Sequence, residues 1–328
     1  MTAPTSAPAP VDVLRLELGP QERADVRALA EELTAAPPGL LDDPDWLAEA
    51  RRIACRLPVR LAEALRALRH DPGESGILSI AGLPVDLDTL PDTPTVRDSV
   101  QRVAAVPSAV AMLLGQHLGE VVAYRNEKHG ALVQDVVPVR SLAASQSNAG
   151  SVSLELHTEN AFHPCRPDLV GLLCLRADRD GGAGTLVSSV RRALPLLDEE
   201  ALAVLGSPRF VTEAPPSFGA GGATMPHPVL GGSAHDPDLR VDFNATIALD
   251  DTARAALDRL CEGLTKVSAP LVLVPGELVF LDNRLVAHGR TDFTPRYDGR
   301  DRWLHRVYVH LDARRGAAHR TGRRPVLV

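Results

Sequence analysis

Cysteine is scarce in this chain of 328 residues, and its spacing excludes two common kinds of structural site. The four cysteines, Cys55, Cys165, Cys174 and Cys261, form no Cys-x-x-Cys pair. A zinc ribbon needs such pairs, and a disulfide framework needs a denser set of cysteines in a short chain. We therefore expect reduced cysteines and a cytoplasmic protein.

Long apolar runs and an excess of positive charge are also missing. No apolar run approaches the roughly 18 residues that span a bilayer, and residues 1–11 lack the basic and apolar regions of a secretion signal. The formal charge is −7, so we expect neither a nucleic-acid partner nor a membrane partner. One basic run, interpreted as a solvated tail, comprises Arg314, Arg315, Arg320, Arg323 and Arg324.

The first third of the chain has the pattern of helices. Residues 1–10, rich in proline and alanine, are predicted to be disordered. Residues 11–120 are predicted to be mostly helical, because leucine, alanine and isoleucine recur at every third or fourth position from Pro20 to Arg69. A strand is predicted from Gly76 to Val85, and another helix from Thr95 to Leu118.

The pattern changes to short apolar strands in residues 121–312. Turn-forming Gly, Pro, Asn and Asp separate these runs, which favours a sandwich or barrel. The runs are SVSLELH, LVGLLCLR, TLVSSV, LRVDF, APLVLV, ELVFLD and WLHRVYV. Helices are predicted at residues 191–205 and 251–267, and a lid at residues 213–241, which are rich in glycine and proline. We expect residues 11–328 to form a single domain.

A histidine and a glutamate stand two positions apart at the end of one apolar run. His-x-acid triplets also arise by chance in a chain of this composition, and a second one occurs at His310-Leu311-Asp312. The triplet His157-Thr158-Glu159 differs because it ends the strand-like run SVSLEL. Alternate residues of a strand face the same side, so His157 and Glu159 are predicted to reach one metal ion.

A third ligand and an anion site follow later in the chain. His288 lies in VAHGR, directly after the strand-like run ELVFLDNRLV. Two histidines and one carboxylate cover one face of an octahedral ion and leave three positions open, as in non-haem Fe(II) oxygenases. Arg302 and Arg306, four residues apart in DRWLHRVYV, are suited to bind a carboxylate of a cosubstrate.

Two other functions fit some of these residues. A zinc hydrolase uses a similar ligand set, but the chain has no His-Glu-x-x-His motif, and Arg302 has no role in such an enzyme. A non-catalytic jelly-roll binding module could retain the shape without the metal, but here all three ligand types are intact. From the residues alone, both alternatives stay open beside an oxygenase.

Several segments resemble a known family. SVSLELHTENAFH, PDLVGLLCLRAD and LDNRLVAHGRTDFTPRYDGRDRWLHRVYV are similar to the clavaminate-synthase-like branch of the Fe(II)/2-oxoglutarate oxygenases. That branch includes hydroxylases of free L-arginine, L-lysine and L-asparagine. GALVQDVVPV and FTPRYDGRDRW resemble the L-asparagine hydroxylases of lipopeptide biosynthesis nearly residue for residue. The resemblance implies a mainly β fold with flanking helices, built on a double-stranded β-helix (jelly-roll) core.

The resemblance also implies roles for individual residues. His157, Glu159 and His288 match the iron ligands of the family, and they are also its catalytic centre. Arg302 and Thr185 match the pair that binds the distal carboxylate of 2-oxoglutarate. The positions that match amino-acid-binding residues are Glu127, Asn148, Asp242 and Arg306. Gln134 belongs to the same motif as Glu127, but the resemblance gives it no role. The implied cofactors are Fe(II), 2-oxoglutarate and O2.

The substrate implied by the resemblance is an L-amino acid hydroxylated at C3 in peptide-antibiotic biosynthesis. L-Asparagine is favoured, because Asp242-x-Asn244 carries one acid where the arginine hydroxylases carry two. Asn244 and Thr158 nevertheless depart from the asparagine hydroxylases. L-Arginine, L-lysine, L-glutamine, citrulline and a carrier-tethered amino acid therefore remain alternatives, although a carrier protein is not favoured.

Overall fold

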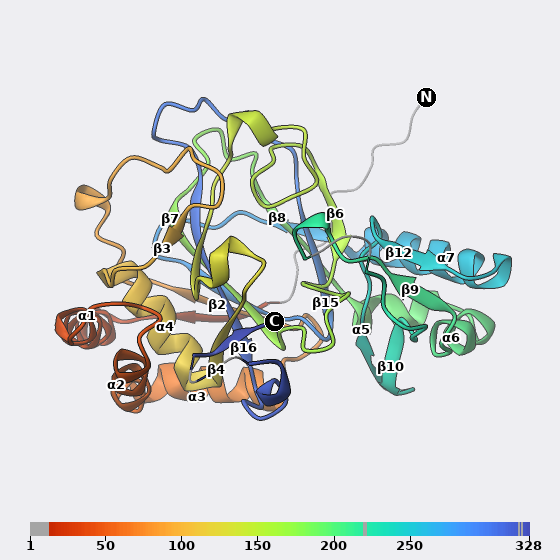
Figure 1. Ribbon diagram of the computed structural model, residues 1–328, viewed down its shortest axis with the longest axis horizontal. Coiled ribbons are helices and arrows are strands. Elements are labelled where there is room, and N and C mark those ends of the chain that lie inside the picture. The colour runs from red at the N-terminus through yellow and green to blue at the C-terminus, as the bar shows by residue number, and fades with distance from the viewer. Residues whose placement is uncertain (1–12, 219–221, 321, 323) are drawn as a thin grey trace.

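The computed structural model describes residues 13–218, 222–320, 322 and 324–328. The disorder predicted for residues 1–10 lies outside this range, as does Arg323 of the basic run. In the described ranges no helix is both long and apolar enough to cross a membrane. Strands fill the middle of the molecule, with one group of helices at the lower left and another at the right of Figure 1.

The larger of the two main sheets has nine strands. At its centre, β7 (Leu169–Arg176) pairs antiparallel with β14 (Leu278–Asp282) and with β16 (Trp303–His310). Almost every residue of these three strands is buried. The sequences of β7 and β14 are accordingly almost entirely apolar, whereas β16 also carries buried polar residues, among them Arg306. The other strands are β1 (Leu14–Glu17), β2 (Ile77–Ala81), β3 (Val100–Gln101), β4 (Glu120–Tyr124), β5 (Val133–Val136) and β17 (Val326–Leu327).

The second main sheet has four strands. Their order is β13 (Ala269–Leu271), β8 (Thr185–Ser189), β15 (Val286–Arg290) and β6 (Leu154–His157). The chain passes from β14 of the larger sheet to β15 of the smaller one, so the run ELVFLDNRLV is divided between the two sheets. Side chains from both sheets line one cavity. Two short pairs are β9 (Phe210–Thr212) with β12 (Thr246–Ala248), and β10 (Leu230–Ser233) with β11 (Asp236–Leu239).

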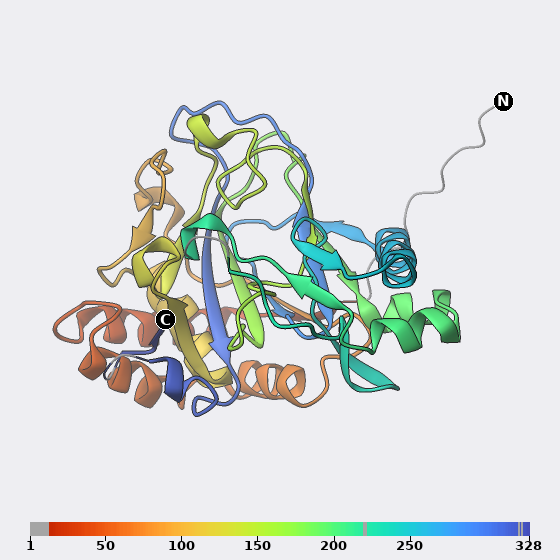
Figure 2. The same cartoon turned by 45° about the vertical axis from the view of Figure 1, so that its right-hand side comes forward.

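Helices cover the two sheets separately. Those on the larger sheet are α1 (Pro20–Ala35), α2 (Pro44–Ala54), α3 (Val59–His70) and α4 (Val106–Leu118). Helix α4 is buried on nearly all sides because it packs against the other three helices and β16. Beside the smaller sheet lie α5 (Val190–Ala193), α6 (Glu199–Leu205) and α7 (Asp251–Val267), which Figure 2 brings toward the viewer. Short 3-10 helices are η1 (Leu87–Thr89), η2 (Lys128–Gly130), η3 (Arg140–Leu142), η4 (Leu194–Leu196), η5 (Pro216–Phe218) and η6 (Ala317–His319).

Two helix predictions need correction. The helix predicted from Thr95 begins only at Val106, because Val100–Gln101 pairs with β5 instead. The helix predicted over residues 191–205 is interrupted near Pro195 and forms α5 and α6. Proline cannot donate the backbone hydrogen bond that would continue the first helix, and Asp198 then caps the second by accepting from the Ala201 N–H at 2.8 Å.

Two strand predictions also need correction. The run LRVDF does not form one strand, since β11 ends at Leu239 and Asp242 makes an isolated bridge with His157. The strand predicted from Gly76 to Val85 is limited to β2, after which Gly82 adopts a positive φ of 85°. The segment of the predicted lid, residues 213–241, contains η5, β10 and β11; its role as a lid stays a prediction.

Strands from the first third of the chain join the larger sheet. Strand β1 pairs with β2, and β2 pairs with β14, so residues 11–120 contribute strands as well as helices; the division at residue 120 stays a prediction. The single-domain organisation stays a prediction. The solvated-tail interpretation is wrong for Arg320, whose side chain is largely buried near Glu120. Arg315 is exposed, although it also forms an ion pair with buried Asp168 at 2.6 Å.

Candidate active site

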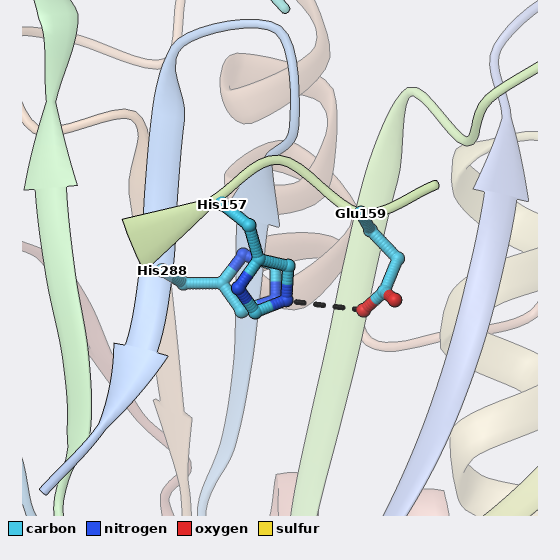
Figure 3. A group of neighbouring side chains, drawn as sticks. All are labelled: His157, Glu159 and His288. Atoms are coloured by element: carbon cyan, nitrogen blue, oxygen red, sulfur yellow. Dashed lines mark ion pairs between the residues drawn. The ribbon is translucent and has the colours of Figure 1, made fainter. Parts of the chain in front are cut away.

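The predicted metal ligands lie together on the smaller sheet. His157 ends β6 and pairs directly across the ladder with His288 of β15. One ligand atom from each of His157, Glu159 and His288 lies within 4.8 Å of the other two, and Figure 3 shows the three side chains converging. Glu159 itself lies two residues beyond the end of β6, so the prediction that the strand carries both ligands is wrong for Glu159.

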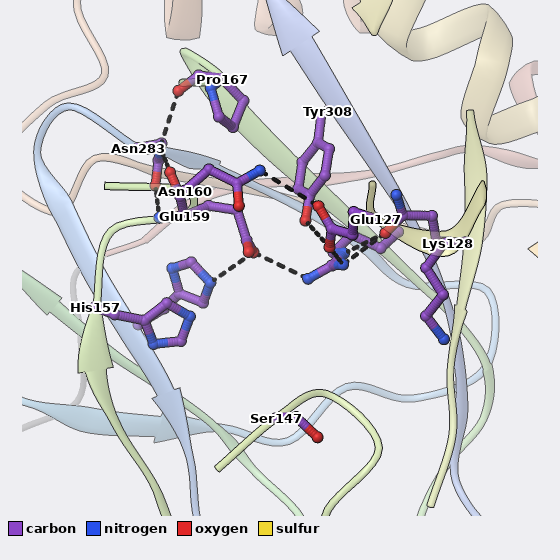
Figure 4. A network of polar contacts seen from close by, with 12 residues as sticks. Glu127, Lys128, Ser147, His157, Glu159, Asn160, Pro167, Asn283 and Tyr308 are labelled. Atoms are coloured by element: carbon purple, nitrogen blue, oxygen red, sulfur yellow. Dashed lines mark hydrogen bonds and ion pairs between the residues drawn. The ribbon is translucent and has the colours of Figure 1, made fainter. Parts of the chain in front are cut away.

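A buried asparagine holds Glu159 in place of the strand. The Asn283 Oδ1 accepts the Glu159 N–H at 2.6 Å, and the Asn283 Nδ2 donates to the Glu159 carbonyl at 3.1 Å. Nδ2 also donates to the Pro167 carbonyl at 2.9 Å (Figure 4). Both backbone hydrogen-bonding groups of Glu159 are thus fixed by one side chain. Sequence reasoning missed Asn283, which lies inside the run ELVFLDNRLV; the turn-forming pair Asp282-Asn283 was the available signal.

The charges around the triad suit a divalent cation. The His157 Nδ1 lies 2.9 Å from the Glu155 carbonyl, which leaves Nε2 available. Burial, and then the neighbouring His157, lowers the pKa of His288, and neutral imidazole is the form that binds metals. Burial raises the pKa of Glu159, but Arg306 and the two imidazoles outweigh it and hold the pKa well below its ordinary value. The set therefore offers an ionised carboxylate at Glu159 and, at His288, an imidazole whose lowered pKa favours the neutral form.

Next to the triad lies a buried guanidinium suited to a carboxylate. The Arg302 Nη2 donates to the Thr185 Oγ1 at 3.1 Å, and both residues are buried. Arg302 forms no ion pair with any acidic side chain that the structure describes. Since a buried arginine stays charged, this guanidinium could bind a carboxylate; its role in binding the distal carboxylate of 2-oxoglutarate stays a prediction.

Arg306 points into the same cavity but is surrounded by acceptors. Its Nη1 donates to the Glu159 Oε2 at 3.1 Å, and its Nη2 to the Glu127 Oε1. The Gln134 Oε1 accepts from Nε at 3.1 Å and from Nη2 at 2.5 Å. The Tyr308 hydroxyl donates to the Glu127 Oε1 at 2.9 Å (Figure 4). A single guanidinium therefore connects a predicted metal ligand to a predicted amino-acid-binding carboxylate.

The other amino-acid-binding positions come from loops. Asn148 belongs to the segment between η3 and β6, and the Asp242 Oδ1 accepts the Asn244 N–H at 2.9 Å. Asn244 is exposed, whereas Asn148 and Asp242 are half-buried. All the residues predicted for metal, cosubstrate and substrate line one cavity of about 570 Å3. Their roles stay predictions, but the structure brings every one of them together.

The cavity also has lining residues that sequence reasoning missed. Arg290 of β15 is buried and donates to the Ser147 carbonyl at 2.9 Å and the Val152 carbonyl at 2.8 Å, so it ties the loop of Asn148 to the strand of His288. Its position in VAHGR, two residues after a predicted ligand, was the available signal. Hydrophobic residues of the predicted lid, among them Phe218, also line the cavity.

Comparison with protein families gives one model that covers most of the chain. The model of the "Taurine catabolism dioxygenase TauD, TfdA family" matches residues 96–308. This range contains every predicted ligand of metal, cosubstrate and amino acid.

Known proteins are similar to this chain over nearly its whole length. It is 47% identical over 296 residues to the L-asparagine oxygenase of Streptomyces coelicolor, covering 90% of this chain and 89% of that protein. It is 39% identical over 295 residues to clavaminate synthase 2 of Streptomyces clavuligerus, covering 88% and 90% respectively. A solved structure of asparagine oxygenase with Fe(II), (2S,3S)-3-hydroxyasparagine and succinate superposes with a TM-score of 0.93 at 45% identity, covering 95% of this chain and 98% of that one.

Proposed function

Because the chain belongs to the TauD/TfdA family of dioxygenases, we propose that it hydroxylates C3 of a free L-amino acid, with L-asparagine as the favoured substrate. Fe(II), 2-oxoglutarate and O2 together supply the oxidation of an unactivated C–H bond. The observation that carries the proposal is the convergence of the predicted ligands on one cavity. We infer that the two main sheets form a double-stranded β-helix around it.

At the metal end, this chain's residues would hold the reactants rather than react themselves. His157, Glu159 and His288 would bind iron through two neutral imidazoles and one ionised carboxylate, the set used by non-haem Fe(II) oxygenases. Arg302 with Thr185 would bind the distal carboxylate of 2-oxoglutarate, which provides the anion that this buried guanidinium lacks. His157, Thr185 and His288 lie on strands of the smaller sheet, and Arg302 directly precedes β16. The sheets therefore largely set the distance between the metal site and the anion site.

At the other end, the amino acid would be oriented by opposite charges. Arg306 is suited to the α-carboxylate, and Glu127 to the α-ammonium group. Asp242 can accept a hydrogen bond from a carboxamide NH2, and Asn148 can donate one to its carbonyl. L-Asparagine offers all four groups. A free amino acid is favoured over a carrier-tethered one, because a thioester no longer has the α-carboxylate that Arg306 would bind.

One observation favours a second substrate class. Asn244 lines the cavity beyond Asp242 and is exposed, so it could contact a side chain longer than that of asparagine. Glutamine and citrulline have longer polar side chains that could hydrogen-bond with the amide of Asn244. Arginine and lysine fit less well, because Asp242 alone would have to neutralise their buried positive charge.

The remaining proposals concern context. We propose that residues 213–241 act as a lid, supported by Glu213, Pro215, Pro216 and Phe218 in the cavity lining. A cytoplasmic enzyme of peptide-antibiotic biosynthesis, with no nucleic-acid or membrane partner, is proposed from the acidic charge and the family resemblance.

The deciding experiment is a substrate panel. Protein purified without oxygen is given Fe(II), 2-oxoglutarate, O2 and single L-amino acids, including aspartate, glutamine, citrulline, arginine and lysine. Succinate and a substrate mass gain of one oxygen are then measured. We expect both with asparagine. Faster turnover of another panel member would overturn asparagine but not the oxygenase, whereas no turnover of any amino acid would overturn the amino-acid hydroxylase.

A further inference from the structure

The family motif that contains Glu127 also contains Gln134, which lies behind the amino-acid site. Gln134 belongs to β5, and the antiparallel register pairs it directly with Arg306 of β16. Residues so paired lie close enough for their side chains to interact. Gln134 is 1% exposed, and the described residues that line the cavity include Arg306 but not Gln134. Any effect of Gln134 on an amino acid must therefore pass through Arg306.

The hydrogen bonds from Arg306 to Gln134 fix the plane of the guanidinium. The Gln134 Oε1 accepts from Nε at 3.1 Å and from Nη2 at 2.5 Å, along one edge of the group. The opposite nitrogen, Nη1, is directed at Glu159. An arginine held at Nε cannot rotate about its last side-chain bonds without losing that contact, so the end carrying Nη1 and Nη2 stays directed toward the cavity.

The neutrality of Gln134 matters as much as its position. Arg306 already faces two carboxylates, Glu159 and Glu127. The amide oxygen adds a hydrogen-bond acceptor without adding a third negative charge. A glutamate of the same shape would add that charge, and it would compete with an incoming carboxylate for the same guanidinium.

We propose that Gln134 is a positioning residue for amino-acid recognition: as a neutral acceptor, it orients Arg306 and leaves the charge of Arg306 available for the α-carboxylate. This inference rests on the proposed function, in which Arg306 binds that carboxylate. It predicts an effect confined to amino-acid binding, because Arg302 and Thr185, which would hold the cosubstrate, contact each other and have no described hydrogen bond with Gln134.

The test compares an isosteric variant with an apolar one. For Gln134→Glu and Gln134→Leu, L-asparagine binding to the Fe(II)- and 2-oxoglutarate-loaded protein is measured by calorimetry without oxygen. Cosubstrate affinity is measured from the visible absorption of the Fe(II)–2-oxoglutarate chelate, and folding from the thermal midpoint. We expect Gln134→Glu to raise the asparagine dissociation constant by about tenfold to a hundredfold, Gln134→Leu to raise it less, and cosubstrate affinity to stay unchanged.

Two controls separate positioning from a general structural role. Gln116 of α4 is a buried glutamine whose side-chain nitrogen and oxygen have no hydrogen-bond partner in the described structure, so Gln116→Leu should leave asparagine affinity unchanged. Lysine lacks the paired Nε and Nη2 donors that contact Gln134. In an Arg306→Lys background, adding Gln134→Leu should therefore lower the affinity for asparagine little further. Equal costs of Gln134→Leu in both backgrounds would overturn the proposal, as would wild-type asparagine affinity in Gln134→Glu. If Gln134→Glu does not fold, the comparison of Gln134→Leu in the wild-type and Arg306→Lys backgrounds decides.

The wild-type measurements keep the two proposals distinguishable. If the wild type binds another L-amino acid and not asparagine, the substrate assignment fails, and the same Gln134 comparison is made with that amino acid, because the α-carboxylate is common to all of them. If the wild type binds cosubstrate but no amino acid, the proposed function fails and the inference about Gln134 fails with it.

Discussion

The two ends of the cavity are built differently. At the metal end, His157, His288 and Thr185 belong to paired strands, and Arg302 directly precedes β16. At the end proposed for the amino acid's side chain, Asn148, Asp242 and Asn244 come from loops, and Asn244 is exposed. Strand pairing fixes side-chain positions more tightly than loops do. Chemistry shared by a family is thus expected at the rigid end, and selectivity, which must differ between relatives, at the loop end.

The largest expected effect comes from removing a ligand at the rigid end. His157→Ala or His288→Ala should reduce succinate formation to background, because two remaining ligands cannot hold the metal in place. The fold should persist, since each side chain contributes little apolar packing. The measurement is succinate formation, with thermal unfolding as the check on folding. Full turnover in either variant would remove that residue from the ligand set.

The next effect concerns the cosubstrate. Arg302→Ala removes the charged partner of a carboxylate, a loss of roughly 1.5–3 kcal/mol. The dissociation constant of 2-oxoglutarate should therefore rise by about tenfold to a hundredfold, with amino-acid affinity much less affected. Arg302→Lys is the matched control, because it keeps the charge without the bidentate geometry, and it should lie between wild type and alanine. Unchanged affinity in Arg302→Ala would transfer the role to Arg306.

A smaller effect is expected at the loop end. The Asp242 carboxylate would repel the side chain of aspartate and accept a hydrogen bond from the NH2 of asparagine. Asp242→Asn removes the negative charge responsible for both effects. Asparagine turnover should fall, and its advantage over aspartate should narrow by about tenfold. The measurement is the ratio of kcat/KM for the two amino acids in each protein. An unchanged ratio would mean that Asp242 does not face the substrate side chain.

The same contrast explains how much of the site could be predicted from the sequence. His157 and His288 were predictable because they follow strand-like runs, and the structure pairs them across one ladder. Glu159 lies beyond its strand, and its position depends on Asn283, more than a hundred residues later in the chain. No local pattern indicates such a contact. Gln134 was visible in its motif, but its contact with Arg306 follows only from the register of β5 and β16.

The fold, like the site, could be predicted from the sequence only in part. Buried central strands such as β7 and β14 were predicted from their apolar runs alone. Short edge elements were not, because their pairing comes from neighbours distant in sequence: Val100–Gln101 lies inside a predicted helix but joins β5. The segment around Asp242 was predicted as a strand, since it has the composition of one, yet it makes an isolated bridge with His157.

The smallest expected effect distinguishes the two substrate classes. The Asn244 side chain is exposed, and the contact from Asn244 to Asp242 uses its backbone N–H, which any residue except proline retains. If asparagine is the substrate, its amide reaches Asp242 and not Asn244. Asn244→Ala should then change asparagine kcat/KM by no more than about twofold, as is usual for exposed side chains. Should glutamine or citrulline be preferred, the same change would remove a hydrogen bond to the substrate and lower their kcat/KM by about tenfold. Measuring all three amino acids on wild type and Asn244→Ala decides between these outcomes, because the change is expected to affect only the side chain long enough to reach it.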